Sequence, residues 1–125
     1  MKSVLLIDSD EIMRETIADI LDSESLKIIN AKDKLDGIKI VCTKCIDLVI
    51  TNVSETDGVI LVQTIKKIMP TLPVITISNG SIISSRTKCE GECSSNSIVI
   101  KSCPLSIDNL IDEVSQILLT NSTVT

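Results

Sequence analysis

Three short apolar segments, each of which ends in polar residues, restrict the fold of this sequence more than any other feature. With the residues that end them, they are Val4–Ile7 with Asp8, Leu48–Ile50 with Thr51 and Asn52, and Val74–Ile77 with Ser78. Strands that are apolar along their whole length are typical of parallel sheets, whose two faces are both covered. Ligands bind at the carboxyl ends of the strands in such sheets. We therefore predict that the three polar ends form one shared site.

Amphipathic segments alternate with these strands along the chain. Strands are expected over residues 3–8, 26–29, 46–51, 72–78 and 98–100, and helices over residues 11–22, 33–44, 58–69, 82–88 and 106–119. Because right-handed crossovers place helices on both faces of a sheet, this pattern predicts an α/β fold, a doubly wound five-stranded parallel sheet with five helices in the flavodoxin-like order 2-1-3-4-5. The segment 82–88 has the weakest helical pattern. Residues 1–125 are expected to form a single domain with a flexible tail over 120–125.

The composition excludes several classes of function. The chain contains no Phe, Tyr, Trp or His, which excludes aromatic base stacking and imidazole catalysis. A net charge of −5 disfavours binding to nucleic-acid backbones, which requires clustered Lys and Arg. No apolar run is long enough to span a membrane, and the sequence has no signal-peptide pattern. We expect a cytoplasmic protein that binds neither nucleic acid nor membrane.

Five landmarks occur in the order and spacing of a known domain. They are Val4–Glu11, Ala31–Asp33, Asp47–Asn52 with Asp57 and Gly58, Leu72–Ser78, and Pro104–Leu110. No landmark is specific by itself, but together they resemble the receiver domain of bacterial two-component response regulators over essentially the whole chain. The resemblance implies a phosphorelay signalling module and not an enzyme.

The resemblance also implies a site at the strand ends, and this sequence alters its chemistry. In the family, two acidic residues after the first strand and an aspartate after the third hold Mg²⁺, and the last of these is phosphorylated. Here these positions read Asp8, Ser9 and Asn52. A side-chain amide is neutral and a poor nucleophile, so Asn52 cannot form an acyl phosphate as aspartate does. With one carboxylate left, we expect no cofactor, or only weak Mg²⁺ binding at Asp8, for which a helix-capping role is the alternative.

The phosphate-pairing lysine of the family has two candidate positions here. Either Lys101 keeps this role with two residues inserted before Pro104, or Cys103 replaces the lysine directly before Pro104. Ser78 matches the family's switch hydroxyl, whereas the expected strand over 98–100 lacks the aromatic residue that responds to it. The degenerate phosphoacceptor pocket implied by the resemblance comprises Asp8, Ser9, Asn52, Ser78, Lys101 and Cys103.

Five cysteines raise the question of a metal or redox site. They are Cys42, Cys45, Cys89, Cys93 and Cys103. The first two and the next two have loosely zinc-like spacing, but the expected fold places a helix between the two pairs. We expect free thiols in a reducing compartment.

Two functions remain open from the sequence. The first is an unphosphorylated receiver that binds a protein partner, a histidine kinase or an output protein. The expected surface is formed by residues 82–88, 98–100 and 106–119, and a homodimer through the same face is the alternative. The second function is an active phosphoacceptor that uses Mg²⁺ and a displaced aspartate, which would be Asp8, Asp10 or Asp57.

Overall fold

Strands and helices alternate along the first 78 residues, as the sequence predicts. The structure is a computed structural model, and it describes residues 2–8, 10–22, 26–51, 55–78, 80–89 and 96–122. In chain order, its elements are β1 (Ser3–Ile7), α1 (Glu11–Asp22), β2 (Lys27–Ala31), α2 (Lys34–Thr43), β3 (Leu48–Thr51), α3 (Glu55–Ile68), β4 (Val74–Ser78), β5 (Ser81–Cys89), β6 (Asn96–Pro104) and α4 (Ile107–Ser122).

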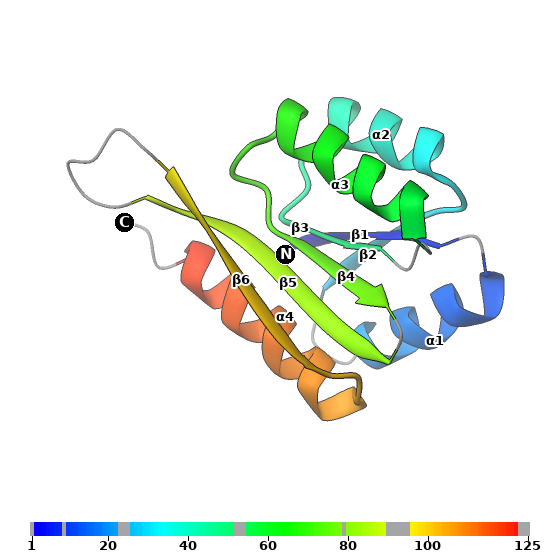
Figure 1. The fold of residues 1–125 in the computed structure, drawn as a ribbon. Helices are drawn as coiled ribbons and strands as arrows, with labels where there is room; N and C mark the ends of the chain where they lie inside the picture. Colours follow the sequence, from blue (N-terminus) through cyan, green and yellow to red (C-terminus); the bar gives the residue numbers. More distant parts are fainter. Residues whose placement is uncertain are drawn as a thin grey trace.

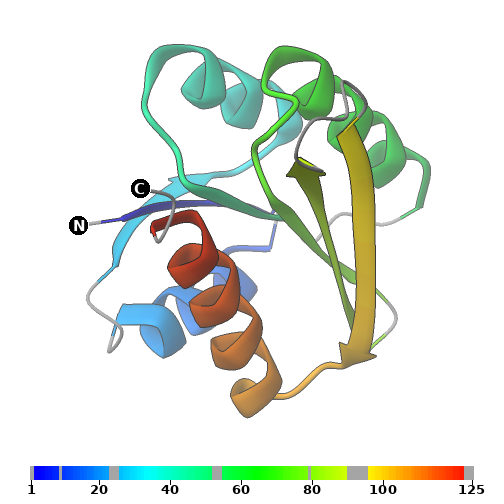
Figure 2. The same ribbon diagram turned by 90° about the vertical axis from the view of Figure 1, so that its left-hand side faces the viewer.

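The described strands form one six-stranded sheet in the order β2-β1-β3-β4-β5-β6. Strands β1 to β4 pair in parallel, whereas β5 is antiparallel to β4 and β6 is antiparallel to β5. Helices α2 and α3 cover one face of the sheet, and α1 and α4 lie on the other (Figures 1 and 2). The α/β class and the flavodoxin-like order of the first four strands are therefore confirmed.

Alternation along the central strands divides the core into two layers. In β1, Val4 and Leu6 belong to the cluster that includes residues of α1 and α4, and Leu5 and Ile7 belong to the cluster that includes residues of α2 and α3. All four are at most 2% exposed. Because successive side chains of a strand point to opposite faces, a strand covered on both faces needs an unbroken apolar run. This explains why the sequence of β1 shows no polar alternation.

Aspartates begin two of the helices. Asp10 Oδ1 accepts hydrogen bonds from the backbone N–H of Ile12 (3.0 Å) and of Met13 (3.4 Å), and so caps α1. Asp33 accepts from the N–H of Asp36 at 2.9 Å and caps α2. Such caps satisfy N–H groups that have no partner within the helix, each at a gain of about 1 kcal/mol. The cap at Asp10, three residues after the end of β1 at Ile7, fixes the start of α1.

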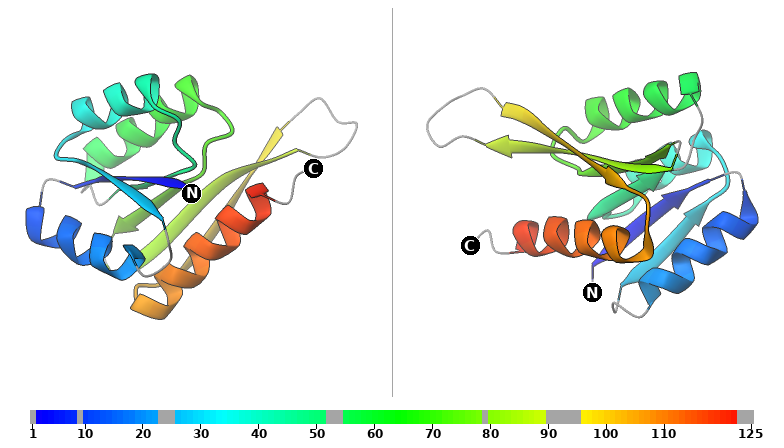
Figure 3. Two further views of the ribbon diagram at one scale, coloured as in Figure 1. Left: turned by 180° about the vertical axis from the view of Figure 1, so that it is seen from behind. Right: turned by 60° about the horizontal axis from the view of Figure 1, so that its bottom comes forward.

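The expected helix over residues 82–88 is wrong, because this segment lies within β5. Its β-branched and serine residues have weak helix propensity and suit a strand. Gly80 precedes it with a φ of 74°, a left-handed conformation that favours glycine and lets the chain reverse after β4. Strand β6 then pairs with β5 along nine residues, and the hairpin that they form runs alongside α4 (Figure 3). The sheet is therefore mixed and not wholly parallel.

Several apolar side chains that the helical pattern assigns to the core lie at the surface. The exposed fractions are 75% for Ile12, 67% for Leu35 and 59% for Ile107. Cys42, on the same helix as Leu35, is also exposed. No helix within the described ranges is both long and apolar enough to cross a membrane.

Candidate functional site at the strand ends

The carboxyl ends of β1, β3 and β4 meet at one edge of the sheet. In the parallel register, Ile7 is paired with Thr51, and Thr51 is paired with Thr76. Asp8 follows Ile7 directly, and Ser78 ends β4 two residues after Thr76. Ser9 and Asn52 lie outside the described residues. The predicted grouping of the strand ends is therefore present in the backbone.

Asp8 organises the turn between β1 and α1. Its side chain is 3% exposed, and Oδ1 accepts a hydrogen bond from the backbone N–H of Asp10 at 2.8 Å. Arg14 Nη1 donates to the backbone carbonyl of Asp8 at 3.0 Å. A carboxylate that accepts the N–H two residues later forms an Asx turn. Asp8 therefore stabilises the turn, and Asp10 is the residue that caps α1.

Thr51 brings an unsatisfied polar group to the same edge. Its side chain is fully buried, and Oγ1 has no hydrogen-bond partner in the described part of the molecule. A buried hydroxyl without a partner costs about 1–3 kcal/mol, so such groups mark strained or functional positions. In the sequence, Thr51 is only the last residue of the strand expected over residues 46–51. Nothing in the sequence indicates that this hydroxyl lacks a hydrogen-bond partner among the described residues.

Lys101 and Cys103 lie on β6, and β5 separates them from β4. In register, Cys103 is paired with Ile82, which is paired with Ile77, and Lys101 is paired with Ser84, which is paired with Ile75. Neighbouring strands lie about 4.8 Å apart, which places β6 roughly 10 Å from β4. Cys103 is partly buried against the core layer of α1 and α4. Neither residue therefore belongs to a strand next to the end of β4.

Among the described residues at this edge, Asp8 and Asp10 are the carboxylates that could face a Mg²⁺ ion. Mg²⁺ requires near-octahedral oxygen ligands, and proteins bind it through carboxylates. The Asp8 and Asp10 carboxylates are engaged by backbone N–H groups of the turn and of α1. No group of three or more His, Cys, Asp or Glu residues in the described ranges could hold a metal ion.

Three of the five cysteines are free thiols in the structure. Cys42 and Cys45 are exposed near the end of α2, and Cys103 is partly buried. For these three residues the expectation of free thiols is confirmed, while the Cys89 side chain and Cys93 lie outside the described part of the chain.

A family model for the response regulator receiver domain matches residues 4–115. The chain belongs to this family. Receiver domains are signalling modules of two-component systems, and the predicted resemblance is confirmed. The match extends through β5 and β6, although the strand order there differs from the expected arrangement.

Similar proteins support the assignment. The putative response regulator NtrX-like of Rickettsia bellii is 36% identical over 84 residues, which are 64% of this chain and 18% of that protein. The sensor histidine kinase RcsC of Escherichia coli is 30% identical over 88 residues, which are 69% of this chain and 9% of that protein. This receiver thus spans less than a fifth of the length of either relative.

Solved structures share the fold. A response regulator receiver domain protein from Clostridium thermocellum has a TM-score of 0.57 and 28% identity, and the match covers 61% of this chain and 64% of that one. The chemotaxis response regulator CheY4 of Vibrio cholerae has a TM-score of 0.68 at 14% identity, and the match covers 94% and 99% of the two chains. The second likeness shows the fold alone.

Proposed function

We propose that this receiver domain works without phosphorylation and acts as an interaction module for a protein partner in two-component signalling. The partner would be a histidine kinase or an output protein. Signal would then be carried by binding, and neither a phosphoryl group nor Mg²⁺ would be required. The receiver fold would thus be used for protein binding and not for phosphoryl transfer.

The residue after Thr51 carries this proposal. Asn52 follows the last residue of β3, which lies between β1 and β4. Formation of an acyl phosphate at this point requires a carboxylate nucleophile, and an amide does not replace it. The remaining acid, Asp8, is buried and already accepts the N–H of Asp10. These bonds also argue against Asp8 as a displaced acceptor.

The structure changes which elements such a partner could contact. The expected partner surface included a helix over residues 82–88, and β5 occupies that segment. A partner that recognises such a helix would not find it in this receiver. The proposed surface therefore includes α4 and its neighbours, and dimerisation through this region stays a prediction.

Intact-mass spectrometry tests the proposal. The receiver and its Ser9→Asp/Asn52→Asp variant would be incubated side by side with Mg²⁺ and acetyl phosphate. We expect a phosphoryl adduct on the variant and none on the parent, because only the variant has carboxylates at positions 9 and 52. An adduct on the parent would overturn the proposal. Peptide mapping would then show whether Asp8, Asp10 or Asp57 is the displaced acceptor.

A further inference from the structure

Two exposed thiols lie close together in the sequence at the end of α2. Cys42 belongs to the last turn of α2, and Cys45 follows in the connection to β3; both are free and exposed. The spacing Cys-x-x-Cys is one at which metal-binding proteins supply two thiolates to one ion. This connection precedes the first residue of β3 and so lies at the amino ends of the parallel strands, at the opposite edge of the sheet from Asp8 and Thr51. The function proposed above makes no use of it.

The backbone on both sides of the thiol pair is anchored in the core. Val41 precedes Cys42 and Ile46 follows Cys45, and the side chains of Val41 and Ile46 are 6% and 8% exposed in the same core cluster. The four residues between them are all exposed. The N–H of Lys44 donates at 2.8 Å to a carbonyl of the last turn of α2. The bend that carries both thiols is therefore held at its two ends, which reduces the entropy lost when the thiols bind an ion.

One copy of this bend supplies too few ligands to close a zinc site. Zn²⁺ in a structural site takes four ligands in a tetrahedron, which are mostly thiolates and imidazoles. The chain contains no His, and the described residues include no group of three or more His, Cys, Asp or Glu that could hold a metal ion. Cys103 packs against the layer of α1 and α4, on the other face of the sheet from α2 (Figure 2). The thiol pair therefore offers half of a tetrahedral site.

Basic residues accompany the thiol pair. Lys44 lies between the two cysteines, and Lys39 lies one helical turn before Cys42; both lysines are exposed. The nearest acidic residue in the sequence, Asp47, accepts the N–H of Ser3 at 2.8 Å. A zinc ion bound by four thiolates has a net negative charge, because the thiolate charges exceed the charge of the ion. Lysines beside the thiolates stabilise such a centre.

We propose that Zn²⁺ joins two copies of this receiver through Cys42 and Cys45 of each copy. Each of the four thiols gives its proton to solvent and forms a Zn–S bond, and the water ligands of the ion leave. The step consumes no oxidant or reductant. A two-fold axis would pass through the ion, so that each copy presents the same pair. The proposal goes beyond the interaction function above and involves none of the strand-end residues.

Zinc titration with sedimentation analysis tests the proposal. The reduced, metal-free receiver would be titrated with Zn²⁺, and its mass in solution would be measured before and after a chelator is added. We expect one Zn²⁺ per two chains, a doubling of the mass with zinc, and its reversal by the chelator. One Zn²⁺ per single chain, or no zinc binding, would overturn the proposal. A dimer that resists the chelator and is dispersed by a phosphine reductant would be a disulfide and would also overturn it.

Substitution of cobalt for zinc reports the ligands. The chain has no aromatic residue, so sulfur-to-cobalt charge-transfer bands in the near ultraviolet are not covered by aromatic absorption. We expect the bands of a tetrahedral Co²⁺ ion with four thiolate ligands, which reach their maximum at one Co²⁺ per two chains. The spectrum of an octahedral ion with oxygen ligands would overturn the proposal.

Paired cysteine variants locate the site. Cys42→Ser/Cys45→Ser should abolish zinc-dependent dimer formation, because serine hydroxyls do not replace thiolates as zinc ligands. Both replaced side chains are exposed, so this variant should fold as the parent does. Cys89→Ser/Cys93→Ser removes the other pair and is the matched control, which should keep the stoichiometry and the dimer. Loss of the dimer in both double variants would show that the two pairs form one site, and would overturn the proposal.

A charge reversal tests the contribution of the lysines. Lys44→Glu puts a carboxylate between the thiols, and Lys32→Glu makes the same change in net charge at an exposed position after β2. We expect Lys44→Glu to weaken zinc binding about threefold or more and Lys32→Glu to leave it unchanged. Tighter binding by a monomeric Lys44→Glu variant would show that the site closes within one chain, and would overturn the proposal. Zinc binding is measured without acetyl phosphate, so a phosphoryl adduct on the parent would overturn the proposed function and leave the zinc result unaffected.

Discussion

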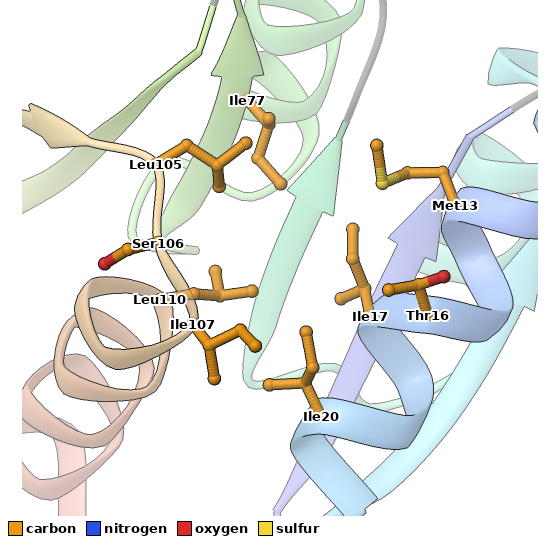
Figure 4. Close-up of a pocket in the computed structure, with 9 residues that line it drawn as sticks. All are labelled: Met13, Thr16, Ile17, Ile20, Ile77, Leu105, Ser106, Ile107 and Leu110. Atoms are coloured by element: carbon orange, nitrogen blue, oxygen red, sulfur yellow. The ribbon is translucent and has the colours of Figure 1, made fainter.

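The two helical layers of this receiver differ in how closely they fit the sheet. On the α2 and α3 side, Gly37 lies against β1, and a Cβ atom there would meet Ile7 Cδ1 and approach Ile7 Cγ1 to 2.8 Å. On the α1 and α4 side, the helices leave an apolar groove of about 210 Å³, whose lining includes Met13, Thr16 and Ile107 (Figure 4). Close packing stabilises a scaffold, whereas an open apolar groove costs stability unless something covers it. The α2 and α3 layer is therefore the more closely packed of the two.

The layers also differ in charge. The acidic residues of α1 and α4 are Glu11, Glu15, Asp19, Asp22, Asp108, Asp112 and Glu113, and their only basic residue is Arg14. The basic residues of α2 and α3 are Lys34, Lys39, Lys66 and Lys67, and their acidic residues are Asp36, Glu55 and Asp57. The receiver's negative charge is thus concentrated on the layer with the groove. Electrostatic steering of a basic partner would act on that side.

The largest effect is expected where the packing is closest. Gly37→Val should destabilise the receiver by about 1–3 kcal/mol, because extra methyl groups force neighbouring side chains and backbone to shift in a well-packed core. The free energy of unfolding in urea measures the change. The matched control is Thr16→Val, which alters the groove lining and should change that free energy by less than about 0.5 kcal/mol. Similar losses for the two variants would refute the difference in packing.

A second substitution identifies the contact responsible. Ile7→Val removes the Cδ1 atom that a Cβ at Gly37 would meet. Residues in direct contact show non-additive effects in double-mutant cycles, by about 0.5–3 kcal/mol. We expect Gly37→Val/Ile7→Val to lose less stability than the sum of the single changes. If the losses of unfolding free energy are additive, the contact between positions 37 and 7 is not the cause of the destabilisation.

A smaller effect is expected where α4 is attached to β5 by polar atoms. Ser84 Oγ donates to Glu113 Oε2 at 3.1 Å, and both side chains are about 5% exposed. Ser84→Ala should cost about 0.5–1.5 kcal/mol, the usual net contribution of one intramolecular hydrogen bond. Thr43→Ala, which removes an exposed hydroxyl bonded to the Lys39 carbonyl, is the control and should stay within about 0.5 kcal/mol. Equal unfolding free energies for Ser84→Ala and the parent would show that this buried bond does not hold α4 in place.

Apolar runs made the first part of the fold predictable from the sequence. The expected strand over 3–8 is β1, and the expected helix over 33–44 is α2, because burial on both faces or on one stripe leaves a clear pattern. The segment 82–88 has no such pattern, and in the structure it pairs with β4 on one side and with β6 on the other. Exposure of Ile12 and Ile107 could not be predicted either. Helical periodicity reports which residues share a face, not whether a neighbour covers it.

At the strand ends, the sequence predicted which residues come together but not the hydrogen bonds that they form. Strand order brought the ends of β1 and β3 together as expected, whereas the cap of α1 is Asp10 and not Asp8. The bond from Arg14 to the Asp8 carbonyl depends on how α1 leaves the sheet, which local sequence does not encode. The lack of a partner for Thr51 Oγ1 among the described residues is likewise a matter of tertiary structure. The chemical roles of Ser9, Asn52, Ser78, Lys101 and Cys103 stay predictions.

The smallest effect is a pH dependence within the α2 and α3 layer. Lys66 Nζ donates to the Leu72 carbonyl at 2.7 Å, and burial lowers the pKa of Lys66 from its ordinary value of 10.5. Between the lowered pKa and 10.5, the unfolded chain binds more protons at this site than the folded chain. The contribution of Lys66 to the unfolding free energy should therefore rise as pH increases through this window.

Lys66→Met isolates this contribution. The variant should lack the part of the rise in unfolding free energy that Lys66 causes below pH 10.5, as measured by urea titrations at a series of alkaline pH values. Lys67→Met, at the exposed neighbouring position, keeps Lys66 and should retain that part of the rise. If both variants follow the parent, the end of α3 is open to water around Lys66. The close packing of the α2 and α3 layer would then not include the last turn of α3. The contact between Gly37 and Ile7 would remain as the evidence that this layer is packed more closely than the α1 and α4 layer.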